Sequence, residues 1–191
     1  MQQESSLSPI FPLSAARRDP TPCPMAACEK DLLDVFKKLG IGFKIFRHPP
    51  FFTVDDCRKY RQHMPGGHCK CLFLKDKKGN MVLAAVHEDV RLDLKALAKT
   101  LGLGRFSFGN PERLEKVLGV TPGAVTPYAL MNVPEGSDKA ALTVVVDEKL
   151  LIFDIVNFHP LHNEATVAVK PDDLLKFIRH YGFSPKIMKT A

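Results

Sequence analysis

From about residue 26 onward, the spacing of hydrophobic side chains changes repeatedly between that of a helix and that of a strand. A helical period over residues 32–39 is followed by Gly40, and glycine commonly ends a helix because it tolerates a left-handed backbone. Residues 41–46 then alternate with a period of two, which predicts a strand that ends at His48-Pro49-Pro50. Thr53 suits the N-terminus of a short helix after that strand.

The rest of the chain continues this alternation of helices and strands. The predicted elements are strands at residues 71–75, 81–86, 142–146 and 165–169, and helices capped by Asp93 and Asn110 or opened by Pro171. The first two of these strands are joined by only five residues, which predicts a hairpin and argues against a doubly wound parallel sheet. The pattern therefore predicts a mixed α/β domain with a largely antiparallel sheet and flanking helices.

Residues 1–24 show no hydrophobic period and contain five prolines and several serines, so we expect a disordered tail. The prolines oppose the amphipathic helix that a mitochondrial presequence needs. Met25 stands where the ordered pattern begins, and residues 25–191 are expected to form one domain.

Composition narrows the class of protein. The chain has 191 residues, of which 45% are hydrophobic, and this suffices for one globular core. It has no apolar run of 18 residues, so no membrane association is predicted. Its five cysteines are odd in number and irregularly spaced, and no signal-peptide pattern precedes them. Reduced thiols and a cytoplasmic location are therefore expected.

The net charge of +6 has two interpretations. Lysines and arginines favour an anionic partner such as RNA, because their contacts with phosphates release condensed counterions. Many basic proteins have no such partner, and the sequence lacks the aromatic-rich basic motif of RNA-recognition domains. A general nucleic-acid binder is therefore the weakest functional hypothesis, and no DNA partner is predicted.

Three segments are harder to explain by folding alone. In the first, strand alternation would place Lys70 on one face with Leu72 and Leu74, and Cys71 on the other. A solvated lysine at a strand end is the simpler interpretation, and a lysine that projects into a cavity is the functional one.

The second segment, residues 119–127, has two glycines and two prolines, which predict an ordered turn. It is either a rigid connection or a loop whose backbone approaches a ligand. The third segment, residues 156–166, contains His159, His162, Asn163 and Thr166 between apolar strands. A histidine before a proline is more often a structural hydrogen-bonding residue than a catalyst.

The sequence predicts neither a metal ion nor a cofactor. His68, Cys69 and Cys71 lie close together, but no second pair of ligands follows at zinc-site spacing. The chain also lacks the phosphate-binding loop, the dinucleotide fingerprint, the nucleophile elbow and the zincin motif.

Taken in order, four motifs resemble the YbaK and prolyl-tRNA-synthetase-associated editing domains, especially the free-standing ProX type. They are His48-Pro-Pro-Phe-Phe-Thr-Val54, Gly67-His-x-Lys70-x-Leu-Phe-Leu-Lys-Asp76, Gly123-Ala-Val-Thr-Pro127 and Asn157-Phe-His-Pro-Leu-x-Asn163-x-Ala-Thr166. The resemblance spans about residues 26–185 and implies a curved, mostly antiparallel mixed sheet. It also implies trans-editing, which is the hydrolysis of alanine from mischarged proline tRNA after its release from the synthetase.

The same resemblance implies the site. The family's essential lysine matches Lys70, its Gly-x-x-x-Pro loop begins at Gly123, and its pocket histidine matches His159. The substrate-binding residues that we expect around them are Ala124, Val125, Thr126, Pro127, Leu161 and Asn163. The implied partners are the aminoacylated 3′ end of a tRNA and prolyl-tRNA synthetase.

One position departs from the family pattern. ProX-type members usually carry asparagine after the lysine, and this chain has Cys71. By the alternation described above, residue 71 points away from Lys70, so the pocket can survive the change. The departure favours an alternative function, a non-catalytic module of the same fold that binds tRNA or the synthetase.

Overall fold

The computed structural model describes residues 26–50, 60 and 63–190. The tail expected at residues 1–24 and the short helix expected after Thr53 lie outside these residues.

Eight strands of the described chain form one mixed sheet in the order β1-β7-β6-β2-β3-β5-β8, with β4 beside β2. The strands are β1 (Phe43–Arg47), β2 (Gly67–Lys75), β3 (Met81–His87), β4 (Ser107–Phe108), β5 (Leu142–Asp147), β6 (Val156–Phe158), β7 (Ala165–Val169) and β8 (Lys186–Met188). Four of the pairs are antiparallel (β1–β7, β6–β7, β2–β3 and β2–β4), and three are parallel (β2–β6, β3–β5 and β5–β8). The predicted mixed α/β fold is confirmed, with antiparallel pairs in the majority.

The helices are α1 (Glu29–Leu39), α3 (Leu94–Leu101), α4 (Pro111–Leu118), α5 (Ser137–Ala141) and α6 (Pro171–His180), with the 3₁₀ turns η1 (Pro127–Asn132) and η2 (Glu148–Ile152). Their ends follow the local chemistry. Gly40 has a φ of 65° where α1 ends, and the carboxylate of Asp93 accepts hydrogen bonds from two N–H groups at the start of α3. Asn110 caps α4 in the same way, so the predicted caps are confirmed.

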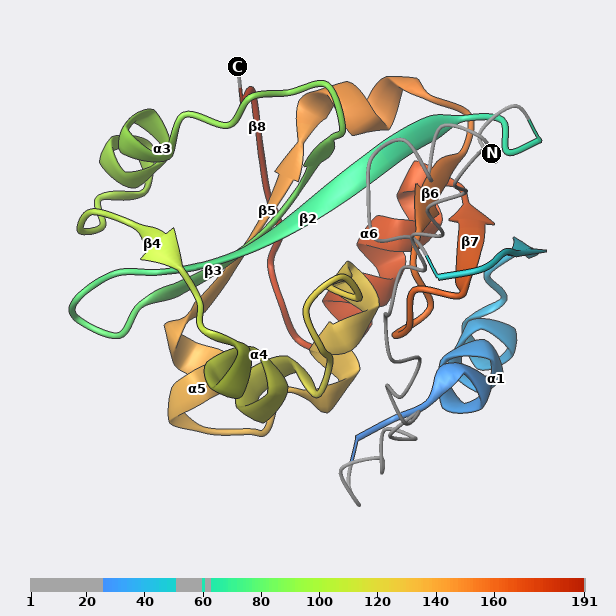
Figure 1. Cartoon of the computed structure of the whole chain (residues 1–191), viewed down its shortest axis with the longest axis horizontal. Coiled ribbons are helices and arrows are strands. Elements are labelled where there is room, and N and C mark those ends of the chain that lie inside the picture. The colour runs from blue at the N-terminus through green and yellow to red at the C-terminus, as the bar shows by residue number, and fades with distance from the viewer. Residues whose placement is uncertain (1–25, 51–59, 61–62, 191) are drawn as a thin grey trace, which may run out of the picture.

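Hydrophobic clusters lie on both faces of the sheet. Figure 1 shows how the helices are arranged around it. The main core packs alternate residues of the central strands against α1, α4, α6 and η1. The second core, on the opposite face, packs Leu74, Val82, Val86 and Val145 under Leu97 of α3. One strand therefore contributes to two cores through its odd and even positions.

Within the described residues, no helix combines the length and the apolar character needed to cross a bilayer.

Candidate active site

Strand β2 presents Lys70 on the face that also carries the second core. Lys70 pairs with Val86 in the antiparallel ladder to β3, and Leu72 and Leu74 follow it on the same face. Cys69, Cys71 and Phe73 pack instead against the main core. The predicted alternation is confirmed, and Cys71 points away from Lys70.

Lys70 is not at a strand end, so the simpler interpretation from the sequence is wrong. Strand β2 begins at Gly67, four residues before the predicted start, and Lys70 is a half-buried interior residue of it. Its ammonium Nζ donates a hydrogen bond to the carbonyl oxygen of Glu88 at 2.9 Å. This bond fixes the direction of the side chain.

Two glycines explain why β2 begins where it does. A Cβ atom on Gly66 would overlap the backbone of Ile155, and one on Gly67 would lie 2.6 Å from the ring of Phe153. Gly67 also donates its N–H to the carbonyl oxygen of Ile155 at 2.8 Å. The absence of side chains lets β2 pair in parallel with β6.

This pairing aligns polar side chains on one face of the sheet. His68 lies opposite Asn157, and Asn157 lies opposite Ala168, so Thr166 shares their face. Lys70 and His159 follow two residues beyond His68 and Asn157, although the ladder itself ends at that pair. These five residues, together with His48, are called the polar row below: His48, His68, Lys70, Asn157, His159 and Thr166.

His48 and Thr166 close one end of the polar row. The hydroxyl of Thr166 donates to Nε2 of His48 at 2.9 Å, while Nδ1 of His48 donates to the carbonyl oxygen of Pro49 at 2.9 Å. The ring centroids of His48 and His159 are 6.0 Å apart. Burial lowers the pKa of His48, and this favours its neutral form.

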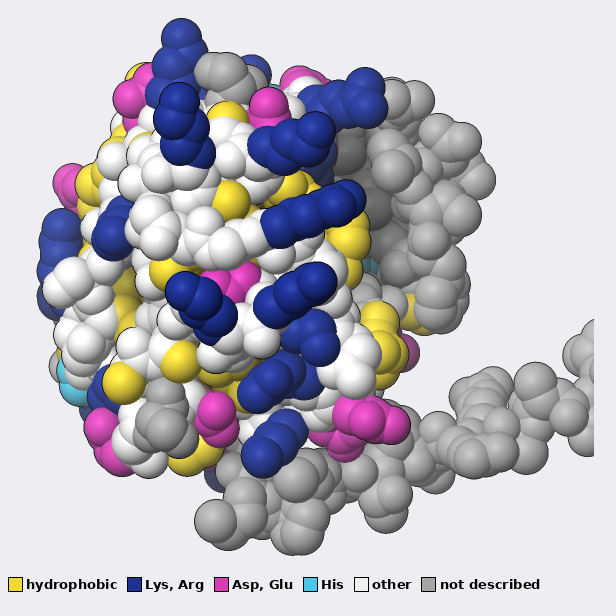
Figure 2. Space-filling model, turned by 90° about the vertical axis from the view of Figure 1, so that its left-hand side faces the viewer, with side chains coloured by type: hydrophobic (Ala, Val, Ile, Leu, Met, Phe, Trp, Pro, Cys, Tyr) yellow, Lys and Arg dark blue, Asp and Glu magenta, His cyan; other side chains and the backbone are white. Residues whose placement is uncertain are grey.

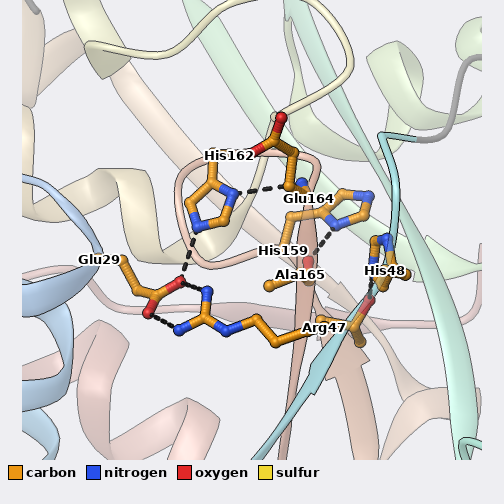
Figure 3. Close-up of polar contacts among 8 residues, drawn as sticks. Glu29, Arg47, His48, His159, His162, Glu164 and Ala165 are labelled. Atoms are coloured by element: carbon orange, nitrogen blue, oxygen red, sulfur yellow. Dashed lines mark hydrogen bonds and ion pairs between the residues drawn. The ribbon is translucent and has the colours of Figure 1, made fainter.

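His159 is held as a neutral imidazole with one defined tautomer. Its Nδ1 lies 2.8 Å from the carbonyl oxygen of Ala165, which can only accept, so the ring proton lies on Nδ1 (Figure 3). Burial lowers the pKa of His159, and the nearby His48 and His162 lower it further. Among the described residues, the lone pair of Nε2 has no hydrogen-bond donor, and it can accept one from a bound molecule.

The loop that carries His159 is anchored by an ion-pair network. The guanidinium of Arg47 binds both carboxylate oxygens of Glu29 at 2.6 Å, and Nε2 of His162 donates to Glu29 at 2.7 Å (Figure 3). Burial opposes the ionisation of Glu29, but these hydrogen bonds outweigh it and hold its pKa below the ordinary value. The network ties the β6–β7 loop to α1 and β1.

The Gly123 loop packs against this β6–β7 loop. Gly123 is exposed with a φ of 90°, and a Cβ atom built there would lie 3.7 Å from Nδ2 of Asn163. Ala124 donates its N–H to Thr121, whereas no acceptor binds the N–H groups of Gly123 and Val125 among the described residues. The loop therefore offers free donors at an exposed turn.

The other predicted pocket residues fall into two groups. Ala124, Thr126 and Pro127 are buried, and the hydroxyl of Thr126 accepts a hydrogen bond at the start of η1. These three residues therefore stabilise the fold of the loop. Val125 and Leu161 are half-buried against the main core. Leu161 also has a φ of 72°, a left-handed conformation that costs energy for a residue with a Cβ atom.

The thiols on β2 are poorly suited to nucleophilic attack. Burial raises the pKa of Cys69 and that of Cys71 well above the ordinary value, so the reactive thiolates are disfavoured. Both side chains lie on the face opposite Lys70. In the described part of the chain, no group of three His, Cys, Asp or Glu side chains is placed to hold a metal ion.

The structure thus connects the predicted residues in part. Gly123 meets Asn163, and His159 and Leu161 belong to the same loop as Asn163. Lys70 lies on β2 and His159 directly follows the neighbouring strand β6, but no hydrogen bond among the described residues joins Lys70 to His159 or Gly123. Their catalytic roles stay predictions.

The sequence indicated His162 as a polar residue of the third segment, but it did not indicate that His162 is anchored by Glu29 and Arg47. No local pattern marks them, because Glu29 lies 18 and 133 positions from its two partners. A role for His48 was also missed, although the resemblance begins with this residue.

Comparisons with known proteins identify the family of this chain. Residues 48–177 match the profile of the family described as the aminoacyl-tRNA editing domain. The chain is 35% identical over 156 residues to the prolyl-tRNA synthetase associated domain-containing protein 1 of Bos taurus, covering 78% of this chain and 88% of the relative. It is 33% identical over 146 residues to the prolyl-tRNA editing protein ProX of Acetoanaerobium sticklandii, covering 76% and 87%.

A solved structure supports the fold. It is described as a candidate trans-editing enzyme for prolyl tRNA synthetase, and it superimposes with a TM-score of 0.64 at 22% identity. The match covers 85% of this chain and 97% of that chain.

Proposed function

Because the chain belongs to the aminoacyl-tRNA editing domain family, we propose that it hydrolyses mischarged aminoacyl-tRNA in trans for prolyl-tRNA synthetase. The preferred substrate in this proposal is proline tRNA that carries alanine. The observation that carries the proposal is that Lys70 of β2 belongs to the same polar row as a neutral His159, which directly follows the neighbouring strand β6.

The chemistry does not require a covalent nucleophile. An aminoacyl ester is already activated, so a site that positions water and stabilises the developing oxyanion is sufficient. An ammonium group has three N–H donors, and the Lys70 ammonium uses one of them on Glu88. The other two can bind the ester oxygen as negative charge develops on it.

His159 supplies the complementary group. Its Nε2 lone pair can accept a proton from the attacking water, or from the ribose hydroxyl beside the ester on the terminal adenosine. The Nδ1–H group donates a hydrogen bond to the carbonyl oxygen of Ala165, so Nε2 is the unprotonated nitrogen of the neutral ring and can take up the transferred proton. The role requires a neutral imidazole, which burial favours.

The Gly123 loop adds backbone donors and a size limit. The free N–H groups of Gly123 and Val125 can bind the acyl or phosphate oxygens of the tRNA terminus. Val125 and Leu161 are suited to form walls that admit the methyl group of alanine and exclude the proline ring. Such a second sieve is needed because the synthetic site of a synthetase cannot strongly reject a smaller side chain.

The deciding experiment measures deacylation of proline tRNA charged separately with alanine, serine, cysteine and proline. We expect rapid hydrolysis of the alanyl ester and little hydrolysis of the prolyl ester, relative to tRNA alone. Hydrolysis of none of the four esters by the folded protein would reject the enzymatic function. Hydrolysis of the prolyl ester as fast as the alanyl ester would reject the size-based specificity.

The alternative is a non-catalytic module of the same fold, and Cys71 in place of the family's asparagine is the observation that favours it. Cys71 faces the main core, however, and the change removes no group from the polar row. The same assay separates the two, because a binding module would retain tRNA affinity without turnover.

A further inference from the structure

Lysine and arginine side chains gather on the side of the molecule that carries α3, β4 and the tip of the β2–β3 hairpin (Figure 2). We call this surface, together with the adjoining α4, the basic face. Its cations are Lys75, Lys77, Lys78, Arg91, Lys95, Lys99, Arg105, Arg113 and Lys116. It lies at the opposite end of the molecule from α1 (Figure 1).

Glu112 and Glu115 of α4 offset part of the positive charge of the basic face, but they form no ion pairs with its cations. None of its nine cations forms an ion pair with the described residues, whereas Arg47 and Lys139 elsewhere do. Two nearby carboxylates, those of Asp76 and Asp93, are engaged by backbone N–H groups. An unpaired set of cations attracts a polyanion and releases its counterions on binding.

The basic face also contains a hollow. A hollow of about 260 Å³ lies between the end of β2 and α4, lined by Lys75, Asn110, Glu112, Arg113 and Lys116. Its lining thus combines three cations with one amide and one carboxylate, a composition suited to a phosphate group rather than to an apolar ligand.

An exposed aromatic ring also belongs to the basic face. Phe108 of β4 is 62% exposed, and it pairs with Leu74 directly beside the pair of Lys75 and Ser107. An aromatic ring among cations is the combination that binds a nucleic-acid strand, because bases stack on the ring while phosphates contact the cations. The chain belongs to the aminoacyl-tRNA editing domain family, so RNA is the polyanion that this combination favours here.

The basic face connects to the candidate active site through α4. This helix ends at Leu118, and the Gly123 loop follows within five residues. Its eight residues span about 12 Å at a rise of 1.5 Å per residue. An RNA strand that continues from the Gly123 loop along α4 would therefore reach the hollow after a few nucleotides.

We propose that the basic face binds the phosphate backbone of the tRNA whose acylated 3′ end occupies the candidate active site, and that Phe108 stacks on one of its bases. This inference rests on the proposed function for the identity of the RNA. It assigns a separate surface to the body of the tRNA, and this surface does not touch the ester.

The test compares two pairs of substitutions of equal charge. Arg113→Ala/Lys116→Ala removes two cations of the hollow, and Lys38→Ala/Arg179→Ala removes two exposed cations from the last turns of α1 and α6. Lys116 also lies in a last helical turn, so the effects on helix stability are matched in part. The measurement is the Kd for uncharged proline tRNA across a range of salt concentrations.

We expect the first pair to weaken tRNA binding about tenfold or more and to reduce the salt slope by about 2, one for each lost phosphate contact. The control pair should change neither. Equal losses for both pairs, or no loss for the first, would overturn the proposal. Phe108→Ala should weaken binding about fivefold or more, whereas Ile152→Ala, at another exposed apolar residue, should not.

Two further measurements separate this inference from the proposed function. The first pair should slow deacylation of full-length tRNA but not of a short acylated oligonucleotide with the same 3′ end. If wild-type protein binds tRNA through the basic face and deacylates nothing, the catalytic proposal fails alone. If it deacylates while the first pair binds tRNA like wild type, or binds phosphatidylserine vesicles instead of tRNA, the present inference fails alone.

Discussion

The two halves of one sheet face differ sharply in composition. Under α3, the half formed by β3, β5 and the C-terminal part of β2 presents Leu74, Val82 and Val86, all fully buried. The β6–β7 half presents the polar row, in which His48 and Thr166 bind each other. Strand β2 crosses both halves, and Lys70 lies at the border between them.

The difference shows how one strand serves two purposes. Burial of apolar side chains lowers the free energy of the folded protein, so folding alone explains the composition of the first half. Buried polar groups cost free energy unless they are hydrogen-bonded. In the polar row, the Nε2 lone pair of His159 and the buried Oδ1 of Asn157 have no hydrogen-bond partner among the described residues. The polar half is therefore the half in which substitution should affect turnover more than stability.

Lys70→Ala should have the largest effect on turnover. Loss of an electrostatic stabiliser in an active site lowers the rate about 10²–10³-fold. Lys70→Met, which keeps the aliphatic stem, should lose as much, because the ammonium is what matters. Single-turnover deacylation of alanyl-tRNA measures the rate, and thermal unfolding should show both variants folded. Unchanged turnover in either variant would contradict the role of Lys70.

Leu74→Ala should show the opposite behaviour. Leu74 is fully buried in the apolar half, so its truncation should cost about 2–5 kcal/mol of unfolding free energy. Urea denaturation measures this loss, while kcat per folded molecule should stay close to wild type. A stable Leu74→Ala variant with impaired turnover would contradict the proposed division, in which the apolar half supports stability and the polar half supports turnover.

The pH dependence of turnover should report His159. Since burial lowers its pKa, the neutral form should persist below the ordinary value of about 6.5, and the rate should fall only at more acidic pH. Each further pH unit below the pKa of His159 should then lower the rate about tenfold. The profile is measured as the enzymatic rate minus the rate of uncatalysed ester hydrolysis.

His159→Gln is the control for that profile. It keeps a hydrogen-bonding side chain but has no group that titrates in this range, so the acidic limb should disappear along with most of the rate. An acidic limb that persists in this variant would assign the titration to another residue.

The smallest effect on turnover should come from the other face of β2. Cys69→Ala/Cys71→Ala should retain most of the deacylation rate, because both thiols face the main core and burial disfavours their thiolates. Rates measured at equal concentrations of folded protein make this comparison. Complete loss of turnover would revive a thiol mechanism.

Local features of this fold could be predicted from the sequence, and long-range ones could not. The helix ends at Gly40, Asp93 and Asn110 follow from neighbouring residues, and a period of two was enough to assign Lys70 and Cys71 to opposite faces. Strand β6 has only three residues, and it exists through pairing with β2 and β7. No local pattern announces such a strand.

The candidate site divides in the same way. The resemblance supplied Lys70, Gly123 and His159 through short motifs, and the structure added the contact between Gly123 and Asn163. The network around Glu29 joins α1, β1 and the β6–β7 loop, which only the folded chain brings together.

That network has a practical consequence for work with fragments of this protein. The family match begins at residue 48, and both Glu29 and Arg47 precede it. A fragment trimmed to the matched range would leave His162 without its carboxylate partner and the loop of His159 without its tether to the first helix. A truncation assay on such a fragment would report a damaged loop rather than a dispensable N-terminus, so useful fragments must begin ahead of Glu29.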